Sequence, residues 1–268
     1  MILEQFIYSA TAPLILGQKM LKDERQDLIV GLVNSENIIG VSDLTDTLNV
    51  TEMTIRRDLK ELEEKGLLKR VHGGAKKVKT LSNVEYSNAE KKAKNIDKKK
   101  YISKKISEII VDDEIIFMGP GSTMEYVSEY IQGKSLTIFT NSLHLFNELI
   151  KIDSLGIRLI GGNYRKVTGA FVGSLALETI KNLRFQKAFI GVNGINDNHA
   201  FTYNEDEGVL QKLILDNASE KFIVADSTKI GNEDFYAFYD IEDVKVITDD
   251  KISSQDLKAL KRYTSLIY

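Results

Sequence analysis

Four polar clusters in this sequence contain residue types that could bind a charged ligand. Each follows a short apolar run, and in chain order they read GPGST, TNS, GGNYR and DSTK. Glycine N–H groups, hydroxyl groups and the side chains of Arg165 and Lys229 are all suited to an oxyanion such as phosphate. The candidate ligand-binding residues in these clusters are Gly119, Gly121, Ser122, Thr123, Thr140, Asn141, Ser142, Gly161, Gly162, Arg165, Asp226 and Lys229.

Each cluster also has a plain structural explanation. The first can be an ordinary strand-to-helix turn, the second can cap a helix, and Arg165 or Lys229 can simply pair with an acid. Glu207 is a further candidate, because its carboxylate could bond sugar hydroxyls, although an acid in a first helical turn also suits the helix dipole. Two oxyanion-binding features combined with hydroxyl groups indicate a phosphorylated sugar as the ligand.

The elements that must position these clusters alternate between helix and strand from about Tyr101 onward. The expected strands are Ile115–Met118, Leu136–Phe139, Ile157–Ile160, Ala188–Val192, Phe222–Ala225 and Val244–Ile247. The expected helices are Tyr101–Ile110, Ser122–Ile131, Leu143–Ile150, Leu175–Asn182, Val209–Ala218 and Ser254–Tyr263. This alternation predicts an α/β domain with a mostly parallel sheet. Ligands of such sheets bind at the carboxyl ends of the strands, so one shared pocket is expected there.

A second group of candidate residues lies nearer the N-terminus. The spacing of apolar residues predicts a helix opened by Ser42 and a second helix, Glu52–Lys65, capped by Thr51. Leu67–Val71 is expected to be a strand that leads into a glycine-rich turn and a basic second strand. Two helices across a short turn, followed by a basic hairpin, predict a winged helix-turn-helix DNA-binding domain.

The second of those helices and the hairpin carry residue types that suit DNA. Arginine can bond guanine with two parallel hydrogen bonds, and threonine suits phosphates or a thymine methyl group. Glycines let the backbone approach a phosphate, and lysines attract DNA of any sequence. The alternative for Arg56 and Arg57 is a set of surface ion pairs with Glu52, Glu61 or Asp58. The candidate DNA-binding residues are Thr51, Thr54, Arg56, Arg57, Lys60, Arg70, His72, Gly73, Gly74, Lys76 and Lys77.

Composition narrows the classes of function. A chain of 268 residues, 43% hydrophobic and 28% charged, is typical of a soluble globular protein with about two domains. It has no cysteine, which excludes disulfide scaffolds, thiolate-ligated metals and thiol nucleophiles. Its three histidines are scattered, so no metal site is expected. The formal charge of −3 hides a basic segment, because residues 66–100 carry eleven basic and three acidic side chains, a net charge of +8.

These features predict four parts. Residues 1–19 are apolar but fit neither a membrane span nor a secretory signal, and are expected to be an atypical extension from an upstream start codon of a cytoplasmic protein. Residues 20–77 are expected to be the winged helix-turn-helix, and residues 78–100 a basic linker with solvated lysines. Residues 101–268 are expected to form the α/β domain that senses the ligand.

The sequence resembles one family over both expected domains. The run TIRRDLKELEEKGLLKRVHGGA, residues 54–75, resembles the N-terminal domain of DeoR-family bacterial transcriptional repressors, with Thr51 where serine is common. The pieces FMGPGST, TNSLHL, LIGGNYR, AFVGSLA and FIVADSTKIG resemble the family's effector domain, which is similar in fold to pentose-phosphate isomerases and coenzyme A transferases. Gly119 stands where many members have aspartate, and this Gly-Pro-Gly form resembles the lactose phosphotransferase repressor subgroup.

The resemblance implies operator DNA and a sugar phosphate as binding partners. In the lactose subgroup the effector is tagatose 6-phosphate, and family members assemble as dimers or higher oligomers. The first hypothesis is therefore a repressor with no enzymatic activity, released from DNA by the phosphorylated sugar. The alternative is a sugar-phosphate isomerase with an appended DNA-binding domain, which would use Asp226, Lys229 or Glu207 as acid–base groups. A ligand-free architectural DNA-binding protein is the third hypothesis, and a large α/β domain argues against it.

Overall fold

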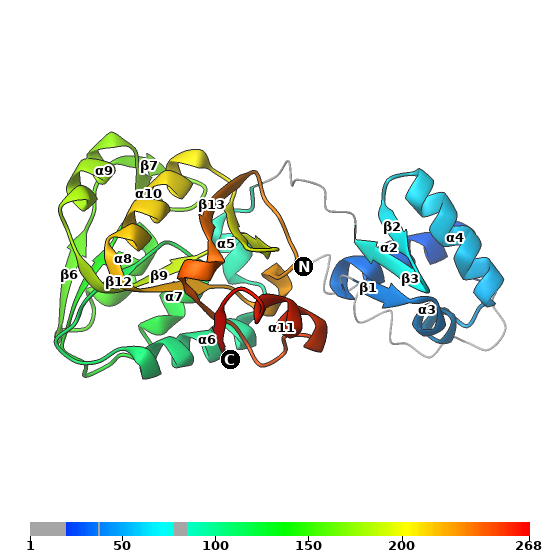
Figure 1. Cartoon of the computed structure of the whole chain (residues 1–268), viewed down its shortest axis with the longest axis horizontal. Coiled ribbons are helices and arrows are strands. Elements are labelled where there is room, and N and C mark those ends of the chain that lie inside the picture. Colours follow the sequence, from blue (N-terminus) through cyan, green and yellow to red (C-terminus); the bar gives the residue numbers. More distant parts are fainter. Residues whose placement is uncertain (1–19, 37, 78–84) are drawn as a thin grey trace. The chain divides into compact units, whose positions relative to one another are not determined.

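The chain divides into two compact units, with the division between Thr80 and Leu81. The structure is a computed structural model that describes residues 20–36, 38–77 and 85–268 (Figure 1). The extension expected at residues 1–19 lies outside the described residues. Each unit has hydrophobic core residues of its own, so each is described by itself.

The N-terminal unit is a winged helix-turn-helix, as the sequence predicts. Its elements are α2 (Lys22–Glu36), β1 (Ile38–Gly40), α3 (Val41–Leu48), α4 (Glu52–Glu64), β2 (Leu68–Val71) and β3 (Gly74–Lys77). Helices α3 and α4 form the helix-turn-helix, and β2 and β3 form the wing. Strand β3 lies between β1 and β2 in an antiparallel sheet, so the wing is fixed to the helices through β1.

The start of α4 follows the expected capping pattern, whereas the start of α3 differs from it. Thr51 caps α4, and its side chain accepts a hydrogen bond from the Thr54 backbone at 3.3 Å. Helix α3 has Gly40 as its cap in place of Ser42, because the Asp43 carboxylate accepts a hydrogen bond from the Gly40 N–H at 3.3 Å. The buried apolar residues of α4 are those that its spacing indicates, Ile55, Leu59 and Leu62.

The C-terminal unit is an α/β domain built on one seven-stranded sheet. Across the sheet the strands are β15 (Ser265–Ile267), β14 (Lys245–Ile247), β12 (Ala218–Val224), β9 (Phe185–Gly191), β4 (Ile115–Met118), β5 (Leu136–Thr140) and β6 (Leu155–Leu159). Every neighbouring pair in it is parallel. The expected α/β class with a mostly parallel sheet is therefore confirmed.

Helices cover both faces of this sheet, and each face has its own core. Helices α6 (Ile96–Ile109), α7 (Ser122–Val127) and α8 (Leu143–Leu149) pack on one face. Helices α9 (Ser174–Lys181) and α10 (Glu205–Asp216) pack on the other, where α11 (Ser254–Leu260) also contributes to the core. Along β4, Ile116 and Met118 join the first core and Phe117 the second, because successive side chains of a strand point to opposite faces.

Several shorter elements of this unit were not predicted. Strands β7 (Asn163–Arg165) and β8 (Ala170–Val172) form a hairpin. Strands β10 (Gly194–Asn196), β11 (His199–Thr202) and β13 (Tyr236–Asp240) form a small antiparallel sheet. The remaining elements are α5 (Asn88–Lys92) and two short 3-10 turns, η1 (Ser227–Lys229) and η2 (Ile241–Asp243).

The basic linker expected at residues 78–100 differs from the structure over residues 85–100. These residues belong to the C-terminal unit, where α5 begins with a reciprocal capping box between Ser87 and Glu90. Lys99 of α6 is buried, although its type indicated a solvated side chain. It shares the inward stripe of that helix with Ile102, Ser103 and Ile106. The lysine-rich stretch is therefore part of the fold of the α/β unit.

Strand order in the large sheet creates a crevice at one edge. From β4 the chain runs outward to β5 and β6, and it then returns to place β9 on the other side of β4. The loops that leave the carboxyl ends of β4 and β9 turn in opposite directions, which leaves a crevice between them at that end of the strands. Among the described residues, every helix is too short or too polar to span a membrane.

Candidate DNA-binding surface and ligand pocket

Helix α4 presents its polar residues on the exposed side of the N-terminal unit. The hydroxyls of Thr51 and Thr54 lie 2.9 Å apart at its start. Arg56 pairs with Glu52 at 2.5 Å, and Arg57, whose side chain is 78% exposed, lies 3.5 Å from Glu61. Exposed pairs one helical turn apart stabilise a helix by only ~0.3–0.5 kcal/mol, so both guanidinium groups can exchange their partners at little cost.

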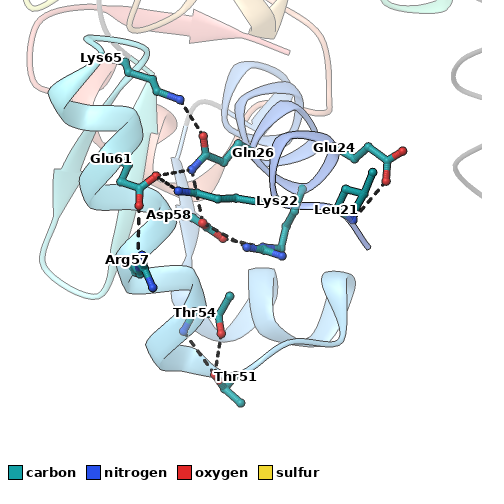
Figure 2. Close-up of polar contacts among 11 residues, drawn as sticks. Leu21, Lys22, Glu24, Gln26, Thr51, Thr54, Arg57, Asp58, Glu61 and Lys65 are labelled. Atoms are coloured by element: carbon teal, nitrogen blue, oxygen red, sulfur yellow. Dashed lines mark hydrogen bonds and ion pairs between the residues drawn. The ribbon is translucent and has the colours of Figure 1, made fainter. Parts of the chain in front are cut away.

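Asp58 was also a possible partner of Arg56 and Arg57, but it pairs with neither. It is buried and joins α4 to α2. It accepts hydrogen bonds from Arg25 Nε at 2.6 Å and from Gln26 Nε2 at 3.4 Å. Figure 2 shows how this network continues to Glu61, which binds Gln26 at 2.9 Å and Lys22 at 2.5 Å. The bonds from Lys22 and Gln26 lower the pKa of Glu61 to about 2. This network fixes the orientation of α4 within its unit.

The wing turn requires glycine at two positions for different reasons. Gly73 has a φ of +78°, in the left-handed region that favours glycine. At Gly74 an added Cβ would lie 2.2 Å from the carbonyl oxygen of Ile39, on the neighbouring strand β1. Arg70 and His72 are exposed beside this turn, and Lys76 is half-buried. The side chain of Lys77 lies outside what the structure describes.

The α/β unit contains a pocket of about 210 Å³ at the crevice beside β4 and β9. Residues of two of the four predicted clusters reach it, from the loop after β4 and the turn after β12, and Glu207 reaches it from the start of α10. The predicted ligand-binding residues that line it are Gly121, Ser122, Thr123, Glu207, Asp226 and Lys229. Helix α7 spans six residues rather than the ten expected. A helix this short has a weak dipole, so the hydroxyls of its first turn are more important for binding an anion in the pocket than the dipole is. Within the described parts of the chain, no acidic or histidine cluster could hold a metal ion.

The other predicted ligand-binding residues do not line this pocket. Ser142 caps α8, and Asn141 donates to the Phe171 carbonyl oxygen at 2.9 Å. The hairpin of β7 and β8 thus covers the carboxyl end of β5, where Thr140 is also buried. The glycines of the set, Gly119, Gly161 and Gly162, are likewise absent from the pocket lining.

Arg165 lies in a partly buried ion-pair cluster in place of an open anion site. Its guanidinium lies 2.8 Å from Glu85 and 2.5 Å from Glu207. Thr168 donates a further hydrogen bond to Glu207. Burial opposes the charge on Arg165, but its bonds to the two carboxylates raise the pKa above the ordinary value. Arg165 therefore pairs with acids, which is the alternative that the sequence left open for this residue.

The sequence-based assignment missed the lysines that residues 85–100 bring to the pocket. Lys91, Lys94 and Lys99 line it together with Lys229. Lys99 donates to the backbone carbonyl oxygens of Lys91 and Lys94, the latter at 2.6 Å. Burial, with repulsion from Lys229 and Lys91 against attraction by Asp226, lowers the pKa of Lys99 to about 8. Burial and repulsion from Lys229 also lower the pKa of Lys91.

Two signals in the sequence could have found these lysines. Ser87 and Glu90 have the spacing of a capping box, which predicts a helix where a linker was expected. Lys99 stands three, four and seven residues before Ile102, Ser103 and Ile106, in line with an inward helical stripe.

A winged helix-turn-helix joined to an α/β unit with a polar pocket defines a DNA-binding regulator that responds to a ligand. Residues 25–80 match the family model described as the DeoR-like helix-turn-helix domain, and residues 94–251 match the DeoR C terminal sensor domain. The chain therefore belongs to the DeoR family of transcriptional repressors.

Similar proteins carry a more specific name. A lactose phosphotransferase system repressor of Staphylococcus epidermidis is 38% identical over 92% of this chain and 100% of its own length. A repressor of the same name from Lactococcus lactis subsp. lactis is 39% identical over 92% of this chain and 99% of its own. Among solved structures, ribose 5-phosphate isomerase A from Neisseria gonorrhoeae is 17% identical, with a TM-score of 0.36 over 50% of this chain and 53% of its own.

Proposed function

We propose that this chain represses a carbohydrate-utilisation operon in the cytoplasm and leaves its operator when a phosphorylated sugar fills the pocket. The observation that carries this proposal is the pocket of the α/β unit, where four lysines and the carboxylates Glu207 and Asp226 line one cavity. Ammonium groups suit a phosphate, and carboxylates suit sugar hydroxyls. Tagatose 6-phosphate is the first effector to test, because the curated relatives are named for the lactose phosphotransferase system.

In this proposal the two units divide the work. Thr51, Thr54, Arg56 and Arg57 contact base edges or flank them, while Lys60, Arg70, Lys76 and Lys77 hold phosphates. His72, Gly73 and Gly74 bring the backbone of the wing to the DNA. Two copies or more bind the operator together. The sugar phosphate can shift DNA affinity only as far as it binds the released conformation more tightly than the DNA-bound one.

An isomerase activity is the less favoured alternative. The proposed base Asp226 already accepts hydrogen bonds from Thr228 and, at 3.4 Å, from Asn95. Glu207 is paired with Arg165. Carboxylates held in this way serve binding better than proton transfer, and the curated relatives are named as repressors. Turnover of pentose or hexose phosphates by the purified chain would restore this alternative.

A thermal-shift panel of sugar phosphates tests the proposed function directly. A ligand that binds only the native state at a hundred times its Kd stabilises the protein by about 2.7 kcal/mol. We expect one phosphorylated sugar to raise the melting temperature of the α/β unit and to release operator DNA over the same concentration range. A panel in which no member does either would refute the proposal.

Replacing Lys229 by methionine is expected to abolish this response while operator binding persists. Lys229 lines the pocket, and within residues 20–36, 38–77 and 85–268 it has no acid at ion-pair distance. Its removal leaves no buried carboxylate unpaired, so the variant should fold. Release of operator DNA by the active sugar phosphate, followed by fluorescence anisotropy, is the measurement. Release of the variant at the wild-type ligand concentration would remove Lys229 from the site.

Arg57→Ala is expected to weaken operator binding by ~1–3 kcal/mol and to weaken binding to random DNA much less. Its partner Glu61 keeps the bonds from Lys22 and Gln26, so the helix should stay folded. The control is Lys76→Ala, which should weaken both complexes alike and reduce the salt dependence by about one unit of slope. Equal losses on operator and random DNA for Arg57→Ala would contradict base recognition by this residue.

A further inference from the structure

One large apolar side chain of the N-terminal unit is exposed to water. Met53, in the first turn of α4, is 81% exposed, and no large apolar side chain in the described parts of the chain is more exposed. It belongs neither to the core of this unit nor to the partly buried residues that pack against that core. Single exposed apolar residues are common on protein surfaces, so the position of Met53 on its helix decides whether it has a role.

Met53 lies on the outward side of α4. It stands four residues before Arg57 and seven before Lys60, a spacing that places these three exposed residues on one side of the helix. The buried residues Ile55 and Leu59 lie on the opposite side. The thioether of Met53 is therefore in the middle of the surface that the helix presents to a partner.

The charges around Met53 indicate what that partner is. Between residues 51 and 60 the exposed charged residues are Glu52, Arg56, Arg57 and Lys60, three cations and one acid, which give a net charge of +2. The centre of a protein–protein interface is usually poor in charged residues. A positive surface complements the phosphates of DNA, and the N-terminal half of such a helix is the part that enters the major groove.

Within the major groove one base presents an apolar group. Thymine carries its 5-methyl group there, whereas the edges of the other bases present hydrogen-bond donors and acceptors. A thioether donates no hydrogen bond and accepts one only weakly, so it is a poor partner for those edges. An unbranched methionine side chain adapts its shape to an apolar partner. The chemistry of Met53 therefore suits a thymine better than any other base.

We propose that Met53 recognises thymine: its side chain packs against the 5-methyl group of a thymine in the part of the operator that each copy of α4 occupies. This inference rests on the proposed function and adds a base contact to those proposed for the threonines and arginines of the same helix. The contact is apolar on both sides. It should therefore contribute to sequence preference and leave the salt dependence of binding unchanged.

Removing single methyl groups from the DNA tests this contact. The probe is the duplex that the full-length chain selects from a random pool, with each thymine replaced in turn by deoxyuridine, which lacks only the 5-methyl group. We expect at least one replacement to weaken binding by the wild-type chain about fourfold, which corresponds to ~0.8 kcal/mol for one buried methyl group. Fluorescence anisotropy measures the affinity for each duplex.

Two variants show whether Met53 makes the contact. Met53→Ala should bind the unmodified duplex about fivefold more weakly than the wild-type chain, and the sensitive replacement should weaken its binding no further. Alanine and methionine both favour helices, so α4 should persist. Met53→Leu keeps an apolar side chain and should keep the sensitivity. The matched control is Lys76→Ala on the wing, which should lose affinity but respond to the missing methyl group as the wild-type chain does.

The outcomes separate this inference from the proposed function. If no replacement weakens binding by the wild-type chain, recognition of thymine is wrong, while preference for the selected duplex over random DNA would still support the repressor. If Met53→Ala responds to every replacement as the wild-type chain does, another residue contacts the methyl group and the inference fails. If Met53→Ala alters the sedimentation of the free chain, Met53 lies between copies and the inference also fails. If the chain prefers no duplex over random DNA, both proposals fail together.

Discussion

Replacing Asp58 by alanine is expected to unfold the DNA-binding unit and leave the α/β unit folded. The Asp58 side chain is 2% exposed and holds the guanidinium of Arg25, itself 12% exposed, at 2.6 Å. Removing one partner of a buried pair costs ~3–5 kcal/mol, because the remaining charge stays desolvated and unpaired. A domain of this size has little stability to lose, since whole proteins are stable by only ~5–15 kcal/mol.

Hydrogen exchange followed by mass spectrometry can locate this unfolding. Peptides from α4 should lose protection in the variant, while peptides from α6 keep theirs. The matched control is Arg56→Ala, which removes only the exposed ion pair with Glu52 and should leave both sets of peptides protected. Wild-type protection of α4 in Asp58→Ala would mean that the network between α2 and α4 does not stabilise the unit.

Replacing Arg165 by methionine is expected to destabilise the α/β unit by ~3–5 kcal/mol, because the buried carboxylate of Glu207 and the largely buried carboxylate of Glu85 lose their shared cation. Glu85 and Glu207 would then lie close together without the guanidinium between them. The loss should concentrate in residues 85–93, the stretch that Glu85 holds to the rest of the α/β unit. Chemical denaturation of the full chain measures the free energy of unfolding, and hydrogen exchange of residues 85–95 shows whether that segment loosens first.

The matched control for this substitution is Arg158→Met. Arg158 is exposed, and its guanidinium lies 5.7 Å from the centre of the Phe139 ring, a contact worth about 0.5–1 kcal/mol at such sites. A midpoint of unfolding for Arg165→Met equal to that of the control would show that the cluster contributes little. Loss of induction in Arg165→Met would then need an explanation other than stability.

The sequence predicted the N-terminal unit well because local rules decide it. Thr51 is a capping residue at the position where the helix starts, and the spacing of Ile55, Leu59 and Leu62 indicates the buried side. The burial of Asp58 could not be predicted, because its partner Arg25 lies 33 residues earlier in the chain. A contact between residues so far apart in sequence leaves no pattern in the local spacing of residues. The contacts proposed between this unit and DNA stay predictions.

The ligand pocket was half predicted, and the missing half has a physical reason. Strand ends in a parallel sheet share an edge, which brought Ser122 and Lys229 together as expected, and Glu207 joins them from the start of α10. Three-residue strands such as β7 and β8 are too short for a periodic signal, so nothing indicated that their hairpin covers Thr140 and its neighbours. The lysines of residues 85–100 were missed because charge was given more weight than helical spacing.

The close approach at Gly74 bears on how this protein could be re-engineered. Its Cα faces the backbone of β1 so closely that even a methyl group would meet the Ile39 carbonyl oxygen at 2.2 Å. His72 and Gly73 have no such neighbour, since His72 is exposed and an added Cβ at Gly73 would meet open space. A library designed to change operator preference can therefore vary the tip of the hairpin freely at His72 and, with some backbone strain, at Gly73. Diversity at Gly74 would yield misfolded clones rather than new specificities.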